Sequence, residues 1–292
     1  MSTVKLLTVI FSILLFSSGI LMAGSASGIQ IAGIPLFFLC GVCGFILHWT
    51  LFVPAFVFQT ERYFDLTGSA SFLTTVVLAL ALNPDPSPLQ LLLTILVSIW
   101  ALRLGYFLYN RIRKAGKDSR FDDIKNKFWR FLLTWTLGGA WVLFTVAAAL
   151  AAITVSSDRE FDLLAISGTI LWLIGFVIEL IADSQKSRFR SVPENANKFI
   201  NTGLWSWSRH PNYFGEILLW LGIAIIAFPS LNGWQHLTLI SPLFVFILLT
   251  RVSGIPLLEQ SARKRWGTLS DYQNYVRKTS VLFPVPRVTT KQ

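Results

Sequence analysis

The sequence predicts an all-α fold, a polytopic bundle of about seven to eight transmembrane helices with both termini in the cytoplasm. Of the 292 residues, 53% are hydrophobic and only 14% are charged, and the mean hydropathy is +0.60. Soluble domains carry about 25% charged residues, so this chain could not cover a soluble globular surface. The two cysteines exclude a disulfide-stabilised secreted domain, and the 24 Phe and 11 Trp residues exclude disorder.

Eight apolar segments are candidates for membrane spans, since a helix needs about 20 apolar residues to cross the hydrocarbon core. These segments are 6–23, 31–58, 67–82, 89–110, 131–155, 161–182, 211–228 and 236–255. None alternates between apolar and polar residues as barrel strands do, and backbone in lipid must satisfy its own hydrogen bonds, so we expect helices. The first segment is longer than the apolar run of a typical signal peptide, and we interpret it as an uncleaved anchor.

The distribution of positive charge predicts the orientation of the chain. With eight spans, segments 111–130, 184–210 and 256–292 fall on one side of the membrane and contain 20 of the 25 Lys and Arg residues. Because cytoplasmic loops carry the excess of Lys and Arg, both termini are expected in the cytoplasm. Topology and anionic lipid headgroups then account for the net charge of +10, and no nucleic-acid partner is expected.

Two carboxylates follow the second apolar segment. Glu61 and Asp65 are four residues apart, so they share one helical face if the helix continues through them. One interpretation is a solvated turn at the membrane interface. The other is a carboxylate pair at the mouth of a cavity, able to hold or donate a proton.

A polar stripe marks the end of the sixth segment. Glu179, Asp183, Lys186 and Arg190 are spaced i, i+4, i+7 and i+11, which places them on one side of a helix. Ion pairs at a helix end would explain Lys186 and Arg190. They do not explain Glu179, which lies inside the apolar run, where ionisable groups are costly. The stripe therefore favours a polar cleft for a ligand.

The next motif surrounds the start of the seventh segment. Pro211 suits the first turn of a helix, so Arg209 and His210 directly precede a helix N-terminus. Free backbone N–H groups together with Arg and His side chains form a good site for a phosphate or a carboxylate. Asn212 and Glu216 lie one turn apart on the same helix, and Glu216 again enters an apolar run. Further residues that could close over this site are Arg251, Trp266, Asp271, Tyr272 and Tyr275.

These residues carry a resemblance to a known family. The pattern Glu179-x3-Asp183-x-Gln-Lys, followed over residues 202–216 by Thr-Gly-Leu-Trp-x-x-Ser-Arg-His-Pro-Asn-Tyr-Phe-Gly-Glu, resembles the DUF1295 family of membrane proteins. That family is similar to the C-terminal domain of steroid 5-alpha-reductases and sterol reductases. It is more distantly similar to isoprenylcysteine carboxyl methyltransferases, which carry a similar Arg-His-Pro segment. The clear match covers about residues 160–285.

The resemblance implies a cofactor and the residues that bind it. In the reductases, NADPH occupies a cytoplasm-facing cavity of a seven-helix bundle, so NADPH is the cofactor implied here. The positions that match the family's cofactor-contacting motifs are Glu179, Asp183, Arg190, Asn212, Tyr213, Gly215 and Glu216. Lys186, Arg209 and His210 complete the predicted cofactor-binding set. No GxGxxG motif follows a strand, so a Rossmann site is not expected, and we predict no metal site.

The resemblance also bears on the first half of the chain. The reductases polarise an enone carbonyl with a Gln-Glu pair and a Tyr on early helices. When the spacing of these residues in the reductases is counted along this chain, Asp65 falls near the Gln position and Trp100 falls at the Tyr position. The expected Tyr is therefore absent from its position, and Tyr106 could replace it. The catalytic set expected from the resemblance is therefore Asp65, Glu61 and Tyr106.

The sequence thus predicts a single membrane domain over residues 1–292, with a divergent substrate half at 1–155 and a reductase-like cofactor half at 156–285. The expected activity is NADPH-dependent reduction of a C=C bond in a lipid- or steroid-like substrate. A first alternative is methyl transfer from S-adenosylmethionine bound near Arg209 and His210. A second is a transporter or scaffold that uses the carboxylates as ion sites. The expected location is the bacterial inner membrane or the endoplasmic reticulum.

Overall fold

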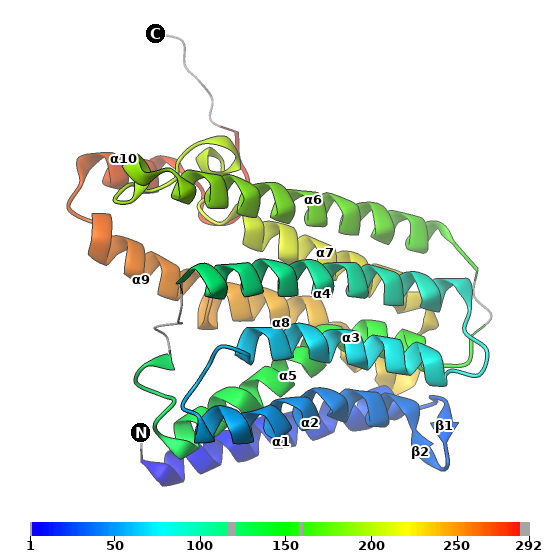
Figure 1. Cartoon of the computed structure of the whole chain (residues 1–292). Helices are drawn as coiled ribbons and strands as arrows, with labels where there is room; N and C mark the ends of the chain where they lie inside the picture. Colours follow the sequence, from blue (N-terminus) through cyan, green and yellow to red (C-terminus); the bar gives the residue numbers. More distant parts are fainter. Residues whose placement is uncertain (1, 116–120, 158–159, 287–292) are drawn as a thin grey trace. The chain divides into compact units, whose positions relative to one another are not determined.

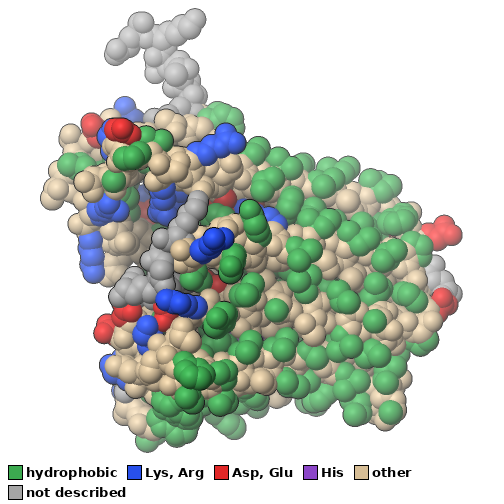
Figure 2. Space-filling view, in the orientation of Figure 1, with side chains coloured by type: hydrophobic (Ala, Val, Ile, Leu, Met, Phe, Trp, Pro, Cys, Tyr) green, Lys and Arg blue, Asp and Glu red, His purple; other side chains and the backbone are tan. Residues whose placement is uncertain are grey.

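A computed structural model describes residues 2–115, 121–157 and 160–286, and 77% of these residues are helical. In the described part, eight helices are long and apolar enough to cross a membrane (Figure 1). Hydrophobic side chains cover the visible length of the helices, and most visible Lys and Arg side chains lie toward helix ends (Figure 2). The prediction of an all-α, multi-pass integral membrane protein is confirmed. The side of the membrane that holds the termini stays a prediction.

The chain divides into two compact units. The first unit contains residues 1–166 and 223–241, and the second contains residues 167–222 and 242–292. The first unit holds α1 (Thr3–Ser25), α2 (Leu36–Val57), α3 (Phe64–Leu82), α4 (Pro88–Ala115) and α5 (Phe128–Ile153). The second holds all or most of α6 (Leu163–Ser191), α7 (Pro211–Ala227), α8 (Ile240–Ile247), α9 (Ile255–Trp266) and α10 (Ser270–Lys278). The single domain expected over the whole chain stays a prediction.

The second span begins later than the sequence predicts. It was expected from residue 31, but a short hairpin of β1 (Gln30–Ile31) and β2 (Ile34–Pro35) occupies that stretch, and α2 begins only after it. Ala32 and Gly33 form the turn of the hairpin with positive φ angles of 50° and 80°. Two-residue hairpin turns favour this conformation because it matches the twist of the paired strands.

The last expected span, 236–255, is an interrupted series of helices. A 3₁₀ helix at Gly233–Leu239 leads into α8, and a π-helical turn at Leu248–Val252 follows it. The expected end at residue 255 is instead the start of α9, whose first turn contains Pro256. Hydropathy averaged over the segment did not reveal this break, although Ser253, Gly254 and Pro256 mark it.

Helix α5 is the core of the first unit. It contacts α1, α2, α3 and α4, and its many buried alanines let these neighbours approach closely. Two amide side chains cover its end: Asn83 Nδ2 donates to the Ile153 carbonyl (2.9 Å), and Gln90 Nε2 donates to the Ala152 carbonyl (3.1 Å). These bonds satisfy carbonyl groups that a helix end leaves without partners inside the helix.

Helices α6 and α7 of the second unit pack side by side through glycines (Figure 1). A Cβ atom added to Gly215 would lie 2.5 Å from the Gly175 carbonyl oxygen, and one added to Gly222 would lie 2.5 Å from the Gly168 carbonyl oxygen. Only glycine fits at such a distance from backbone, and small residues support this close packing in membrane helices. The contact brings the Glu179 region of α6 against the first turns of α7.

Candidate functional site

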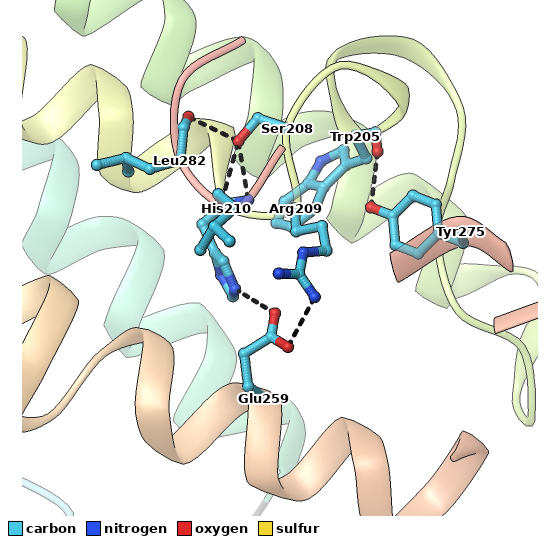
Figure 3. Close-up of polar contacts among 8 residues, drawn as sticks. Trp205, Ser208, Arg209, His210, Glu259, Tyr275 and Leu282 are labelled. Carbon is cyan, nitrogen blue, oxygen red and sulfur yellow. Dashed lines mark hydrogen bonds and ion pairs between the residues drawn. The ribbon is translucent and has the colours of Figure 1, made fainter. Parts of the chain in front are cut away.

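Residues 280–282, which follow α10, form hydrogen bonds with the segment that joins α6 to α7. Ser208 Oγ donates to the Leu282 carbonyl (2.8 Å) and accepts a bond from the His210 amide (3.1 Å) (Figure 3). The Arg209 amide donates to the Ser280 carbonyl at 2.8 Å. These bonds fix the backbone immediately before α7, so they also fix where the Arg209 and His210 side chains begin.

Glu259 on α9 joins these two side chains. Its Oε2 accepts from Arg209 Nη1 and its Oε1 accepts from His210 Nε2, both at 3.0 Å (Figure 3). Burial lowers the pKa of His210, and the contact with Glu259, which raises this pKa, offsets burial only in part. The imidazole is therefore neutral at pH 7, and the nitrogen that faces the carboxylate carries its proton.

Two buried nitrogen atoms of this cluster have no hydrogen-bond partner within the part of the chain that the structure describes. They are Arg209 Nε and His210 Nδ1. Buried polar atoms in folded proteins normally have partners, so both atoms are available to a bound molecule. Arg209 Nε can donate, and Nδ1 of a neutral His210 can accept. The His210 ring also stacks on Tyr213, with 5.7 Å between ring centroids and 9° between ring planes.

Arg209, His210 and Glu259 form one side of a cavity of about 180 Å³ within the second unit. Five cationic side chains line the cavity, namely Lys186, Arg190, Lys198, Arg209 and Arg265, and Glu259 is the acidic residue among the lining residues. The aromatic lining residues are Phe189, Phe199, Trp205, Trp266, Tyr272 and Tyr275. A cavity with this excess of positive charge and these flat apolar walls suits an anion that carries an aromatic ring.

Trp205 is a fixed part of the cavity wall. Its Nε1 donates to the Ala182 carbonyl of α6 (3.0 Å). Its own carbonyl accepts from Tyr275 Oη of α10 (2.7 Å), as Figure 3 shows. The ammonium of Lys186 lies 4.5 Å from the centre of the Trp205 ring. Phe199 contacts Tyr275 in turn, with 5.3 Å between ring centroids. These contacts tie α6, the joining segment and α10 into one wall.

The structure brings together part of the cofactor-binding set predicted from the sequence. Lys186, Arg190, Arg209 and His210 all line the cavity, and so do Trp266, Tyr272 and Tyr275 of the tail. The other predicted residues do not line it: Glu179, Asp183, Asn212, Tyr213 and Glu216, together with Arg251 and Asp271. All four residues of the polar stripe do lie on one helix, because α6 extends to Ser191. Its two carboxylates are buried, whereas Arg190 is exposed.

The residues of the catalytic set expected in the first half lie on three elements of the first unit, the connection from α2 to α3, α3 and α4. Helix α2 ends at Val57 and α3 begins at Phe64, so the helix does not continue through Glu61 and Asp65 and gives them no common face. Glu61 lies in the connection, is only 3% exposed and accepts from Lys125 Nζ at 2.8 Å. Asp65 lies in the first turn of α3. Tyr106 on α4 is 73% exposed.

The charged residues of the cavity that were not predicted from the sequence are Lys198, Arg265 and above all Glu259. A signal for Glu259 exists in the sequence, because it is the one acidic residue between Gly254 and a run of three basic residues, 263–265. Its partners, however, lie 49 and 50 residues earlier, and no helical spacing connects positions so far apart.

Comparison with known proteins places the chain in a family. The family model described as "Protein of unknown function (DUF1295)" matches residues 51–279, so the chain belongs to this family and the resemblance seen in the sequence is confirmed. No solved structure matches the chain.

Several curated relatives match shorter parts of the chain. The 3-oxo-5-alpha-steroid 4-dehydrogenase 1 of Bos taurus is 35% identical over 78 residues, which are 27% of this chain and 28% of that protein. The enzyme of the same name from Mus musculus is 28% identical over 119 residues, 41% of each chain. An uncharacterized protein of Schizosaccharomyces pombe is 25% identical over 236 residues, 67% of this chain and 65% of that protein. The matched regions thus span less than two thirds of each of these relatives.

Proposed function

We propose that this membrane protein is an NADPH-dependent reductase that reduces a C=C bond in a lipid- or steroid-like substrate. The observation that carries the proposal is the cavity of the second unit, where five cationic and six aromatic side chains line one hollow. The relatives named 3-oxo-5-alpha-steroid 4-dehydrogenase support the same class of reaction and substrate.

The lining residues have the chemistry to bind the phosphates and the aromatic base of a dinucleotide. Arg209 offers Nε as a donor with no partner in the described chain, and guanidinium groups bind phosphate oxygens through paired bonds. His210 Nδ1 accepts, which suits a ribose hydroxyl. Trp205 and Tyr272 supply flat faces for an aromatic base. When bound, NADPH supplies a hydride to one alkene carbon, and the other carbon takes a proton.

We propose that the proton comes from the sequence-predicted set in the first unit. Glu61, Asp65 and Tyr106 all remain candidates. The Lys125 ammonium lies 2.8 Å from a Glu61 oxygen, and an ionised carboxylate accepts hydrogen bonds without donating a proton. This contact therefore argues against Glu61 as the proton donor.

The charge of the cavity argues against the two alternative functions. S-adenosylmethionine carries a sulfonium cation, which the five Lys and Arg side chains would repel. A transporter that binds cations at Glu179 or Asp183 would not need aromatic walls and an excess of positive charge nearby. Both alternatives predict a ligand preference that differs from that of a reductase.

The test is ligand binding by the full chain purified in detergent. NADPH should raise the thermal unfolding temperature more than S-adenosylmethionine does, because at equal concentrations the ligand that binds the folded state more tightly stabilises it more. Arg209→Lys should weaken NADPH binding about tenfold, equal to about 1.4 kcal/mol, because Lys cannot reproduce paired contacts to a phosphate. Arg188→Lys is the matched control, since Arg188 is an exposed α6 residue that does not line the cavity.

Two results would contradict the proposal. Stabilisation by S-adenosylmethionine but not by NADPH would favour the methyltransferase alternative. Equal NADPH affinity in Arg209→Lys and the unaltered protein would move the nucleotide away from this cavity.

A further inference from the structure

A second hollow lies in the first unit and is separate from the proposed cofactor cavity. It has a volume of about 300 Å³ and is lined by Arg62, Tyr63, Leu66, Tyr109, Ile112 and Arg113. The first three residues belong to the start of α3 and the connection before it, and the last three belong to the end of α4. None of Glu61, Asp65 and Tyr106 lines it.

The position of this hollow is at the level where two apolar helices end. Helix α3 begins at Phe64, and the apolar part of α4 ends at Asn110. Tyr63 and Tyr109 are 61% and 52% exposed. Tyrosine is enriched at the boundary between hydrocarbon and headgroups, where its ring contacts lipid and its hydroxyl contacts polar groups. The hollow therefore opens at headgroup depth.

The charge in this hollow is not neutralised by the residues that the structure describes. Neither the Arg62 nor the Arg113 side chain has a hydrogen-bond or ion-pair partner among the residues that the structure describes. Glu61, the carboxylate next to Arg62 in the sequence, points to Lys125 instead. Two guanidinium groups that line one hollow repel each other, and an anion between them would convert that repulsion into attraction.

We propose that this hollow binds the phosphate of an anionic membrane lipid. Arg62 and Arg113 supply paired donors to the phosphate oxygens, and the Tyr63 and Tyr109 hydroxyls can donate to the remaining oxygens. Leu66 and Ile112 supply an apolar wall beside the phosphate, which suits the first carbons of an acyl chain. A water-soluble phosphate ester shares the headgroup chemistry but would leave that wall without a partner.

Native mass spectrometry of the full chain tests this proposal, with phosphatidylglycerol and phosphatidylcholine as competing probes. The unaltered protein should retain phosphatidylglycerol in preference to phosphatidylcholine. The double variant Arg62→Gln/Arg113→Gln should lose roughly tenfold or more of this preference, because it removes the charged donors. Both side chains lie at the surface of the hollow, so the variant should fold, and its thermal unfolding and NADPH binding should remain those of the unaltered protein.

The matched control is Lys127→Gln/Arg130→Gln. It removes the same charge from the same unit, at the start of the apolar helix α5, and neither residue lines the hollow. This control should keep the lipid preference within about twofold. Equal loss of preference in both double variants would overturn the proposal, because it would indicate a general effect of surface charge. Binding of glycerol 3-phosphate as tight as that of phosphatidylglycerol would also overturn it.

Discussion

Two carboxylates that meet basic partners show how the two units differ. Glu61 of the first unit is 3% exposed and meets Lys125, whose side chain is 23% exposed. Glu259 of the second unit is 21% exposed and holds both Arg209 and His210 at the edge of a cavity. The Glu61–Lys125 contact joins the connection between α2 and α3 to the connection between α4 and α5. Glu259 holds two side chains in place while leaving one nitrogen of each available to a ligand.

The surroundings of the two carboxylates explain this difference. The segment around Lys125 lies beside a dense aromatic cluster of Phe52, Phe121, Phe131 and Trp135, which leaves Glu61 little access to water. Around Glu259 the rings of Phe199, Trp266, Tyr272 and Tyr275 also contact one another, but they line a cavity. The same kind of ion pair therefore serves stability in one unit and positioning in the other, and the packing around it decides which.

The largest effect is expected where α6 and α7 touch. Gly215→Ala would place a Cβ 2.5 Å from the Gly175 carbonyl oxygen and 2.7 Å from the Glu179 amide, both of which are backbone atoms. The helices would have to separate, so we expect a loss of about 3 kcal/mol of stability, at the upper end of overpacking effects. Denaturant unfolding in detergent measures this loss. NADPH affinity should fall with it, because α6 carries Lys186 and Arg190.

Gly19→Ala is the corresponding change in the first unit. A Cβ at Gly19 of α1 meets nothing within 4 Å, so this variant should be as stable as the unaltered protein or slightly more stable. Equal stability of the two alanine variants would show that the α6–α7 contact is not tight.

An intermediate effect is expected from the ion pair of the first unit. Lys125→Met removes the ammonium that bonds the buried Glu61, and loss of a bond to a buried charge should cost about 2 kcal/mol. NADPH affinity should not change, since Lys125 does not line the cofactor cavity. A stable variant that has lost reductase turnover would instead assign Glu61 to the chemistry and would remove the contrast between the two carboxylates.

Most of the fold could be predicted because lipid imposes a simple rule on the sequence. A run of apolar residues that crosses a membrane must be helical, and all eight expected spans correspond to observed helices. The hairpin at Gln30–Pro35 and the π turn before α9 escaped prediction, because they depend on local backbone conformation within apolar stretches. Hydropathy is insensitive to such conformations.

The candidate site could be predicted only where its residues are neighbours in the sequence. Arg209 and His210 stand together before a helix, and Lys186 and Arg190 follow helical spacing, so their grouping was visible. Glu259 pairs with Arg209 across 50 residues and Lys125 pairs with Glu61 across 64, and these pairings arise only from the folded chain. A pattern of spacing has no information about such distant contacts.

The smallest expected effect is a dependence of stability on pH that arises in the second unit. Burial lowers the pKa of His210, against the opposing influence of Glu259. In the unfolded chain a histidine titrates near pH 6.5, so between that pH and the lower pKa of the folded state the unfolded chain binds more protons. Stability must then fall as the pH drops below about 6.5, because protons favour the form that binds them.

Replacement of this histidine should flatten the dependence. Between pH 7.5 and pH 5.5, the unaltered protein should lose more stability than His210→Gln, as measured by denaturant midpoints in detergent at each pH. His236→Gln, at an exposed histidine of the first unit, is the control, and it should follow the unaltered protein. Parallel curves for all three proteins would mean that the His210 imidazole gains its proton as readily in the folded state as in the unfolded chain. In that case Nδ1 of His210 would become a donor to the ligand, instead of an acceptor, as the pH falls below about 6.5.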